Sequence, residues 1–224
     1  MDTVCAIPGA ALAVDRSHVP DPKLDIKPGD GTTESTAVLA GGCFWCTEAV
    51  FQKLDGVLEV TSGYSGGSES SADYEAVCSG TTDHAEAIRI RFDPRRISYG
   101  QLLKVFFAVA HDPTQVNRQG NDRGRQYRSA VFYADAAQKE TTEKYIAQLD
   151  AAKSYPKKIV TQVVPLTAFY PAEAYHQDYL TLHPESGYIA RFDMPKIANL
   201  KAMFPQQYRA EPALVMARAG TKPQ

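Results

Sequence analysis

The sequence predicts an α+β fold built on a two-layer split βαβ, or ferredoxin-like, core with additional helices and irregular extensions. Short apolar runs typical of strands alternate with segments of helical spacing, in the order β-α-β, a loop, then β-α-β. No internal repeat and no shift in composition divides the chain. We therefore expect a single domain over residues 36–205, an irregular extension before it at 1–35, and a flexible tail after it at 206–224.

The first half of the domain centres on two closely spaced cysteines. Residues 36–40 are apolar and end at a Gly-Gly pair, which indicates a buried strand. Residues 43–54 repeat small and apolar side chains with helical spacing, and Gly56 ends this helix. Residues 57–62 predict a second strand, and residues 63–71, rich in glycine, serine and acidic residues, predict a loop.

The second half repeats the alternation of strand and helix. Apolar and basic side chains alternate over residues 87–92, which is typical of a half-buried strand. Ser98 and Gln101 form a capping box that starts a helix, and this helix must end before Pro113. Residues 129–133 predict another strand.

Four further segments complete the domain. Residues 135–153 predict a polar helix with a capping pair at its start, and residues 159–166 are a β-branched run. Residues 169–177 predict a helix start with Pro171 at its first position, and residues 196–204 a last short helix.

The composition excludes several classes of protein. The 24 Lys and Arg residues against 26 Asp and Glu give a net charge of −2, without the basic excess of a nucleic-acid-binding protein. No apolar run approaches the roughly 20 residues that span a bilayer, so we expect no membrane segment. Four cysteines in 224 residues are too few for a disulfide scaffold.

The amino-terminal extension favours a cytoplasmic protein. Residues 6–14 are small and apolar but lack the basic n-region and the long h-region of a secretory signal. A periplasmic location is the alternative if this segment is the remnant of a processed signal. Cys5, in this extension, is interpreted as a bystander.

The motif GGCFWC, residues 41–46, places Cys43 at the strand-to-helix turn. The helix dipole favours a thiolate there by about 0.3–1 kcal/mol. Lowering a thiol pKa from about 8.5 to 7 requires about 2 kcal/mol, so a second contribution is needed. Cys46 follows one turn later on the same face, near enough for a disulfide.

The motif allows three interpretations. In the first, Cys43 is a nucleophile beside an aromatic pocket, and a neighbouring thiol forms a disulfide with it after it is oxidised. In the second, Cys43 and Cys46 are the redox pair of a thioredoxin-like disulfide oxidoreductase. The third is half of a zinc site that Cys78 and His84 complete. The absence of a second CxxC and the bulky Phe-Trp insert disfavour zinc.

Glu86 enters an apolar strand, so we expect it to be partly buried. A buried carboxyl keeps its proton near neutral pH and can act as a general acid. A rise of its pKa from about 4.3 to 7 costs roughly 3.7 kcal/mol, which requires a dry, aromatic-lined site. A surface glutamate is the alternative. The arginines of residues 118–128 are interpreted as a solvated loop, and His176 as a surface or hydrogen-bonded structural residue.

Six segments together resemble the peptide methionine sulfoxide reductases of the A type. They are GGCFWCTEAVF, GYSGG, YEAVCSGTTDHAE, FDP, HDPTQVNRQGNDRGRQYRSAVFY and FYPAEAYHQDYL, in the family's order over residues 36–182. The resemblance implies a catalytic domain that reduces the S epimer of methionine sulfoxide, free or in proteins and peptides. It also implies that no metal or organic cofactor is needed and that thioredoxin is the usual electron donor. We expect a monomer.

The resemblance assigns roles to particular residues. Cys43 matches the nucleophile that attacks the sulfoxide sulfur, and Phe44 and Trp45 match the apolar pocket for the substrate methyl group. Glu86 matches the acid that protonates the sulfoxide oxygen. Tyr74 and Tyr127 match the hydrogen-bond donors to that oxygen, and Asp122 matches the residue that orders the site.

The second thiol is where the chain departs from the commoner family pattern. Many members have glycine at the position of Cys46 and carry resolving cysteines near the carboxyl terminus, whereas no cysteine follows Cys78 here. Attack on the sulfoxide forms a sulfenic acid at Cys43, which a second thiol converts into a disulfide. Cys46 is the first choice for this resolving thiol by proximity, Cys78 the second, and Cys5 the third.

Overall fold

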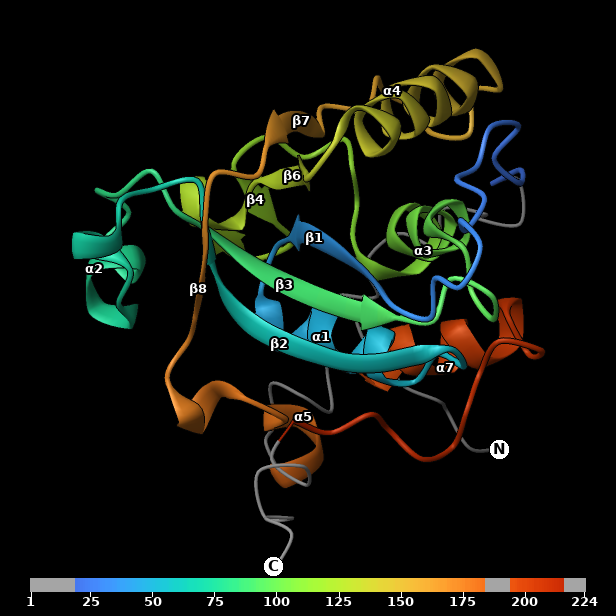
Figure 1. Cartoon of the computed structure of the whole chain (residues 1–224). Coiled ribbons are helices and arrows are strands. Elements are labelled where there is room, and N and C mark those ends of the chain that lie inside the picture. Colours follow the sequence, from blue (N-terminus) through green and yellow to red (C-terminus); the bar gives the residue numbers. More distant parts are fainter. Residues whose placement is uncertain (1–18, 184–193, 216–224) are drawn as a thin grey trace, which may run out of the picture.

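The computed structural model describes residues 19–183 and 194–215, and it confirms the mixed α+β fold (Figure 1). Six strands form one curled sheet in the order β7-β6-β1-β3-β2-β8, in which only the β6–β7 pair is parallel. The strands are β1 (Ser35–Gly41), β2 (Val57–Ser65), β3 (Ala85–Phe92), β6 (Ser129–Tyr133), β7 (Gln162–Pro165) and β8 (Phe169–Pro171). A separate hairpin pairs β4 (Arg118–Gln119) with β5 (Asp122–Arg123).

The helices differ widely in length. The α-helices are α1 (Phe44–Gln52), α2 (Tyr74–Cys78), α3 (Tyr99–Val105), α4 (Ala136–Ala151), α5 (Tyr179–Leu182) and α7 (Met194–Met203). The 3-10 turns are η2 (Glu69–Ser71), η4 (Arg125–Tyr127) and η5 (Ala174–His176), and α3 continues into a π-helix, η3 (Phe106–Ala110). Among the described residues no helix is long and apolar enough to cross a bilayer.

Both faces of the sheet are covered, which explains why the central strands are almost entirely apolar. In β1, Ala37 and Leu39 face the main core, which they share with side chains of α1, α3, α4 and α7. Val38 and Ala40 face the opposite side, where a smaller cluster is covered by the chain that runs from β7 into β8. The helices α1, α3, α4 and α7 therefore pack on one side of the sheet, and connecting chain covers the other (Figure 1).

The local signals for strands and helix starts are confirmed at most positions. The predicted strand at 129–133 is β6, and the strands at 36–40 and 87–92 are β1 and β3, each with two further residues. The capping box is present: Ser98 Oγ accepts from the backbone N–H of Gln101, and Gln101 Oε1 accepts from that of Ser98.

One predicted boundary and one predicted helix are wrong because distant contacts override local preference. β2 continues to Ser65, so the loop expected from residue 63 begins later. Where the sequence predicts a helix start at Pro171, residues 169–177 form instead the edge strand β8 followed by η5. The close pairing of β8 with β2 explains both differences, since a Cβ atom at Gly63 would lie 2.4 Å from the carbonyl oxygen of Tyr170.

The chain ends pack onto the domain at several points. Residues 19–34 contain neither helix nor strand, and Tyr145 Oη donates to the carbonyl of Pro20 at 2.8 Å. Near the other end, Arg209 N–H donates to the carbonyl of Lys53 at 2.9 Å, close to the last turn of α1. Cys5 and residues 216–224 lie outside the described residues.

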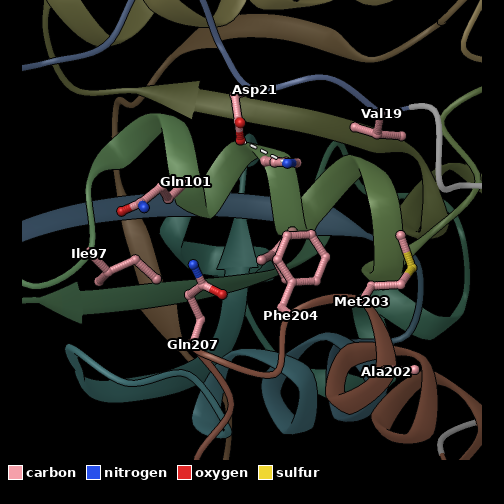
Figure 2. Close-up of a pocket in the computed structure, with 10 residues that line it drawn as sticks. Val19, Asp21, Ile97, Gln101, Ala202, Met203, Phe204 and Gln207 are labelled. Carbon is pink, nitrogen blue, oxygen red and sulfur yellow. Dashed lines mark hydrogen bonds and ion pairs between the residues drawn. The ribbon is translucent and has the colours of Figure 1, made fainter.

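A cavity of about 520 Å³ lies between residues 19–21, α3 and α7 (Figure 2). Lys104, one of the lining residues, forms an ion pair through Nζ with Asp21 Oδ1 at 2.7 Å. None of the residues that line this cavity is a predicted site residue, so the predicted active site lies elsewhere in the molecule.

Candidate active site

Cys43 is the last residue before α1, at the turn that joins β1 to the helix. Gly42 permits this turn because its φ of 89° lies in the left-handed region. A Cβ atom at Gly42 would also lie 2.6 Å from the Cβ atom of Gln119, so only glycine fits beside the β4–β5 hairpin. The half-buried Cys43 thiol therefore lies at the amino end of α1, where the helix dipole favours a thiolate.

Glu86 lies in β3 and is 3% exposed. Its Oε2 atom accepts a hydrogen bond from the backbone N–H of Phe44 at 3.0 Å, so the carboxyl group lies against the residue that follows Cys43. Burial raises the pKa of Glu86 to about 8; the Phe44 N–H opposes this rise, and the charge of Asp122 adds to it. The burial expected from the sequence is confirmed, and the carboxyl group keeps its proton at neutral pH.

Two tyrosines lie close to the same carboxyl group. Tyr74 is the first residue of α2, and Tyr127 is the last residue of η4. Burial is the largest cause that raises the pKa of each phenol, and the charges of Glu86, Cys43 and Cys78 add to it. Both hydroxyl groups therefore stay protonated and can donate hydrogen bonds.

Asp122 lies half-buried in β5, and its charge acts on both Glu86 and Tyr127. The hairpin that carries it is held beside the nucleophile turn through Gln119, whose Nε2 donates to the carbonyl of Asp112 at 2.6 Å. The structure thus brings Asp122 into the electrostatic environment of the buried carboxyl group.

Phe44 and Trp45 belong to a cluster of aromatic rings at the start of α1. Phe44 is 1% exposed, and its ring centroid lies 5.9 Å from that of Tyr64. The half-buried Trp45 ring stacks on Tyr179, with centroids 3.8 Å apart and planes inclined by 8°. Its Nε1 donates to Nδ1 of His176 at 3.2 Å. A stacked ring and a hydrogen bond therefore set the orientation of Trp45.

His176 is a buried, neutral member of this cluster. Burial lowers its pKa, and the charge of Glu173 opposes the change. Because Nδ1 accepts from Trp45, the ring proton lies on Nε2, which is 3.9 Å from Glu173 Oε2. Glu173 in turn accepts from the Tyr64 hydroxyl and from the backbone N–H of Tyr74, both at 2.9 Å. The sequence indicated a structural histidine, but not that its partner is Trp45.

Tyr179 and Glu173 are residues of the site that the sequence analysis missed. Both lie in the segment FYPAEAYHQDYL, whose resemblance to the family was the only signal for them. A single aromatic or acidic residue in an irregular segment follows no spacing rule. Only the folded chain shows that Tyr179 contacts Trp45 and that Glu173 contacts Tyr74.

The described part of the chain carries three cysteine thiols, those of Cys43, Cys46 and Cys78. Cys46 lies one turn after Cys43 in α1 and is 3% exposed. Cys78 ends α2 and is half-buried; burial raises its pKa, and a hydrogen bond with Tyr74 opposes the rise. The first two choices for the resolving thiol, Cys46 and Cys78, therefore belong to elements that build the site.

The zinc alternative requires His84 to lie with the three cysteines. Its Nε2 instead donates to the carbonyl of Ser68 at 2.9 Å, and its ring packs edge-on against Tyr170. Over residues 19–183 and 194–215, no three histidine, cysteine or acidic side chains gather as metal ligands.

The arginine-rich loop over residues 118–128 is not wholly solvated, which corrects the sequence interpretation. Arg128 is 8% exposed, and its guanidinium group donates to the carbonyls of Asp83 and His84 at 2.8 and 3.0 Å. These bonds tie the end of η4 to the residues before β3, so this arginine helps to hold two sides of the site together.

The arrangement combines a thiol at a helix start, a neutral carboxylic acid and two phenol donors beside an aromatic cluster. A nucleophile and an acid can act together only if they prefer opposite protonation states. The helix dipole favours a charged Cys43, whereas burial favours a neutral Glu86. Such a site can attack an electrophilic sulfur and protonate the oxygen that leaves it.

Comparison with known proteins identifies the family. A family model for peptide methionine sulfoxide reductase matches residues 35–208. Peptide methionine sulfoxide reductase MsrA 2 of Mesorhizobium japonicum is 50% identical over 194 residues, 87% of this chain and 98% of the relative. Peptide methionine sulfoxide reductase MsrA of Thermus thermophilus is 52% identical over 171 residues, 76% of this chain and 96% of the relative.

Solved structures agree with the sequence relatives. Mxr1 of Saccharomyces cerevisiae in its reduced form has a TM-score of 0.63 and 34% identity, covering 71% of this chain and 91% of that one. Methionine sulfoxide reductase A of Corynebacterium diphtheriae has a TM-score of 0.60 and 32% identity, covering 81% and 89%. The chain therefore belongs to the peptide methionine sulfoxide reductase family and is an oxidoreductase that reduces methionine sulfoxide.

Proposed function

We propose that this reductase acts on the S epimer of methionine sulfoxide, free or in proteins and peptides, with Cys43 as nucleophile and Glu86 as acid. The observation that carries the proposal is the buried Glu86 carboxyl group, hydrogen-bonded to the Phe44 N–H beside the thiol. Sulfoxide oxygen leaves poorly until it is protonated, so an acid must lie next to the nucleophile. The tyrosines add hydroxyl donors on the same side.

The first step breaks the sulfur–oxygen bond of the substrate. The Cys43 thiolate attacks the sulfoxide sulfur, and Glu86 gives its proton to the oxygen while Tyr74 and Tyr127 donate hydrogen bonds to it. Asp122 orders these groups. This attack forms a bond between the two sulfur atoms. The protonated oxygen then passes to the sulfur of Cys43 as a hydroxyl group, and the sulfur–sulfur bond breaks with its electron pair remaining on the substrate. Methionine is released and Cys43 becomes a sulfenic acid, so sulfur of the substrate is reduced and sulfur of the enzyme is oxidised.

The substrate methyl group is proposed to lie against Phe44 and Trp45. Both side chains follow the nucleophile directly, and the Trp45 ring is held by its stacked neighbour and its hydrogen bond. An apolar wall at this place binds the methyl group and excludes water from the reacting sulfur.

The second step restores the enzyme through a disulfide. The thiol of Cys46 attacks the Cys43 sulfenic acid, a sulfur–sulfur bond forms, and water leaves. The position of Cys46 one helical turn after Cys43 supports it as the resolving thiol. We propose that a thioredoxin then reduces this disulfide by dithiol exchange.

We also propose that the centre of the sheet is a split βαβ, ferredoxin-like unit. The order β6-β1-β3-β2 supports this, because β3 lies between β1 and β2 and is antiparallel to both. In this unit α1 is the crossover between β1 and β2, which places the nucleophile at the start of a crossover helix.

The test uses a peptide that contains methionine S-sulfoxide, with dithiothreitol or with thioredoxin and its reductase. Cys43→Ser is expected to abolish reduction with either donor. Cys46→Ser is expected to complete one stoichiometric turnover but to lose recycling by thioredoxin. Thiol counting and peptide mapping after one equivalent of sulfoxide identify the disulfide.

Three results would contradict parts of this proposal. Normal recycling by Cys46→Ser together with failed recycling by Cys78→Ser would reassign the resolving thiol. Preference for the R epimer would overturn the stereochemical assignment. Rapid reduction of insulin disulfides would favour the alternative, a thioredoxin-like disulfide oxidoreductase.

A further inference from the structure

One face of α1 contacts the start of α5 through three side chains. Trp45, Glu48 and Gln52 are spaced by three and four positions, so they lie on the same face of the helix. The Trp45 ring stacks on Tyr179, and Gln52 Nε2 donates to Asp178 Oδ1 at 2.7 Å. Glu48 lies between these two contacts along α1.

Glu48 is an unusual residue for this buried position. It is 1% exposed, and its Oε1 atom has no hydrogen-bond partner among the described residues. Burial raises its pKa to about 8; the backbone N–H groups of Asp178 and Tyr179 oppose this rise, and the negative charge of the Asp178 carboxylate adds to it. A buried carboxyl group costs free energy that an apolar residue of similar size would not, so packing alone does not account for it.

The start of α5 needs a partner from outside its own segment. Asp178 precedes the helix with a φ of 56°, and its side chain makes no capping hydrogen bond. Its Oδ1 atom accepts instead from Gln52 and from the backbone N–H of Val215. The first N–H groups of a helix require acceptors, and the group that faces those of Asp178 and Tyr179 is the Glu48 carboxyl.

We propose that Glu48 is a positioning residue for the reductase reaction: from α1 it holds the start of α5 so that the Tyr179 ring stays flat against Trp45. Glu48 does not touch the substrate in this role. It acts through Tyr179 on the Trp45 ring, which is proposed to bind the substrate methyl group, so the inference rests on that proposed function of Trp45. Loss of the contact frees Tyr179 and loosens the Trp45 ring.

The sole tryptophan of the chain makes this directly measurable, because all tryptophan emission comes from Trp45. Glu48→Ala is expected to raise KM for the sulfoxide peptide about tenfold with a smaller change in kcat, and to increase acrylamide quenching of Trp45. Glu48→Gln keeps an oxygen acceptor for the two N–H groups and is expected to stay within about twofold of wild type. Glu48→Asp, whose shorter side chain draws the carboxyl group back from α5, should raise KM and acrylamide quenching as Glu48→Ala does.

A double-mutant cycle tests the route through Tyr179. Tyr179→Ala is expected to reproduce the effects of Glu48→Ala, and the double variant to be no worse than either single one. Thr142→Ala is the control: it removes a buried hydroxyl that bonds Tyr99 between α3 and α4, and it should lower stability without changing KM or quenching.

The outcomes separate the inference from the function on which it rests. The positioning role is overturned if Trp45→Ala raises KM while Glu48→Ala leaves both KM and Trp45 quenching unchanged. If Glu48→Ala does not fold, Glu48→Asp is judged by the same two measurements. Additive effects in the cycle also overturn the positioning role. If Trp45→Ala leaves KM unchanged, the proposed pocket wall itself is wrong.

Discussion

Glu86 keeps its proton at neutral pH because the fold removes it from water and offers it a single backbone donor. The carboxyl group lies at the point where β3 passes the start of α1, so the same strand pairing that buries it also brings it to Cys43. The phenols of Tyr74 and Tyr127 extend the set of protonated groups. At the scale of single residues, the site is a neutral acid next to a thiol that the helix dipole favours as thiolate.

Replacement of Glu86 tests whether proton donation or hydrogen bonding is the larger part of its role. Glu86→Gln retains a donor but no transferable proton, so we expect slower sulfenic acid formation, by about 10²–10⁴-fold. Glu86→Ala should be slower still, because it also leaves a cavity beside the Phe44 N–H. Single-turnover measurements give the two rates, and equal rates would show that the amide hydrogen bond contributes nothing.

The pH dependence of the same step follows from the raised pKa of Glu86, about 8. Only the protonated acid can serve the leaving oxygen, so the single-turnover rate of wild type should fall as pH rises through about 8. In Glu86→Gln this fall should be absent. A wild-type rate that keeps rising from pH 7 to 9 would exclude a protonated Glu86 as the acid.

Hydrogen bonds at helix ends organise the elements around the site. The capping box at Ser98 starts α3, whose continuation η3 packs against α1 and β1. At the other end of α1, the backbone N–H groups of Arg209 and Ala213 donate to the carbonyls of Lys53 and Gln52. The carboxyl-terminal segment thus supplies donors to carbonyls that a helix end leaves unpaired.

Ser98→Ala removes the side-chain half of the capping box and a hydroxyl bond to Asp25. We expect a loss of about 1–2 kcal/mol in the free energy of unfolding, measured by urea denaturation, with little change in turnover. Ser70→Ala, on the exposed η2 turn, is the control and should cost less than about 0.5 kcal/mol. Equal losses in the two variants would show that the cap adds no stability.

At the scale of the whole molecule, burial raises the pKa values of two carboxyl groups in the described residues, Glu48 and Glu86, both to about 8. Between their ordinary values near 4.5 and about pH 8 the folded state binds more protons than the unfolded state. Stability therefore falls as pH rises through this range, and the loss is complete above it.

This gives a measurable slope for the intact protein. The free energy of unfolding should decrease between pH 7 and about pH 8 and then level off. In the double variant Glu48→Gln/Glu86→Gln the decrease should be much smaller. Urea denaturation at steps of half a pH unit measures both curves, and parallel curves would contradict the burial of these two groups as acids.

Much of the domain could be predicted from short segments of sequence. β6, the capping box at Ser98 and the turn at Cys43 depend on residues within a few positions of one another, so local patterns were sufficient. The segment at 169–177 was predicted wrongly because β8 exists only through its pairing with β2. Arg128 was placed in solvent because its acceptors lie more than 40 positions earlier in the chain.

The sequence by itself determined the chemical groups of the site: the nucleophile turn is a local motif, and the resemblance to the family assigned the acid, the two phenols and Asp122. Only the tertiary structure decided how these groups are supported. Tyr179 reaches Trp45, and the N–H groups at the start of α5 reach Glu48, across more than 120 positions of chain. Contacts over such distances depend on how the elements pack, which no local pattern of residues specifies.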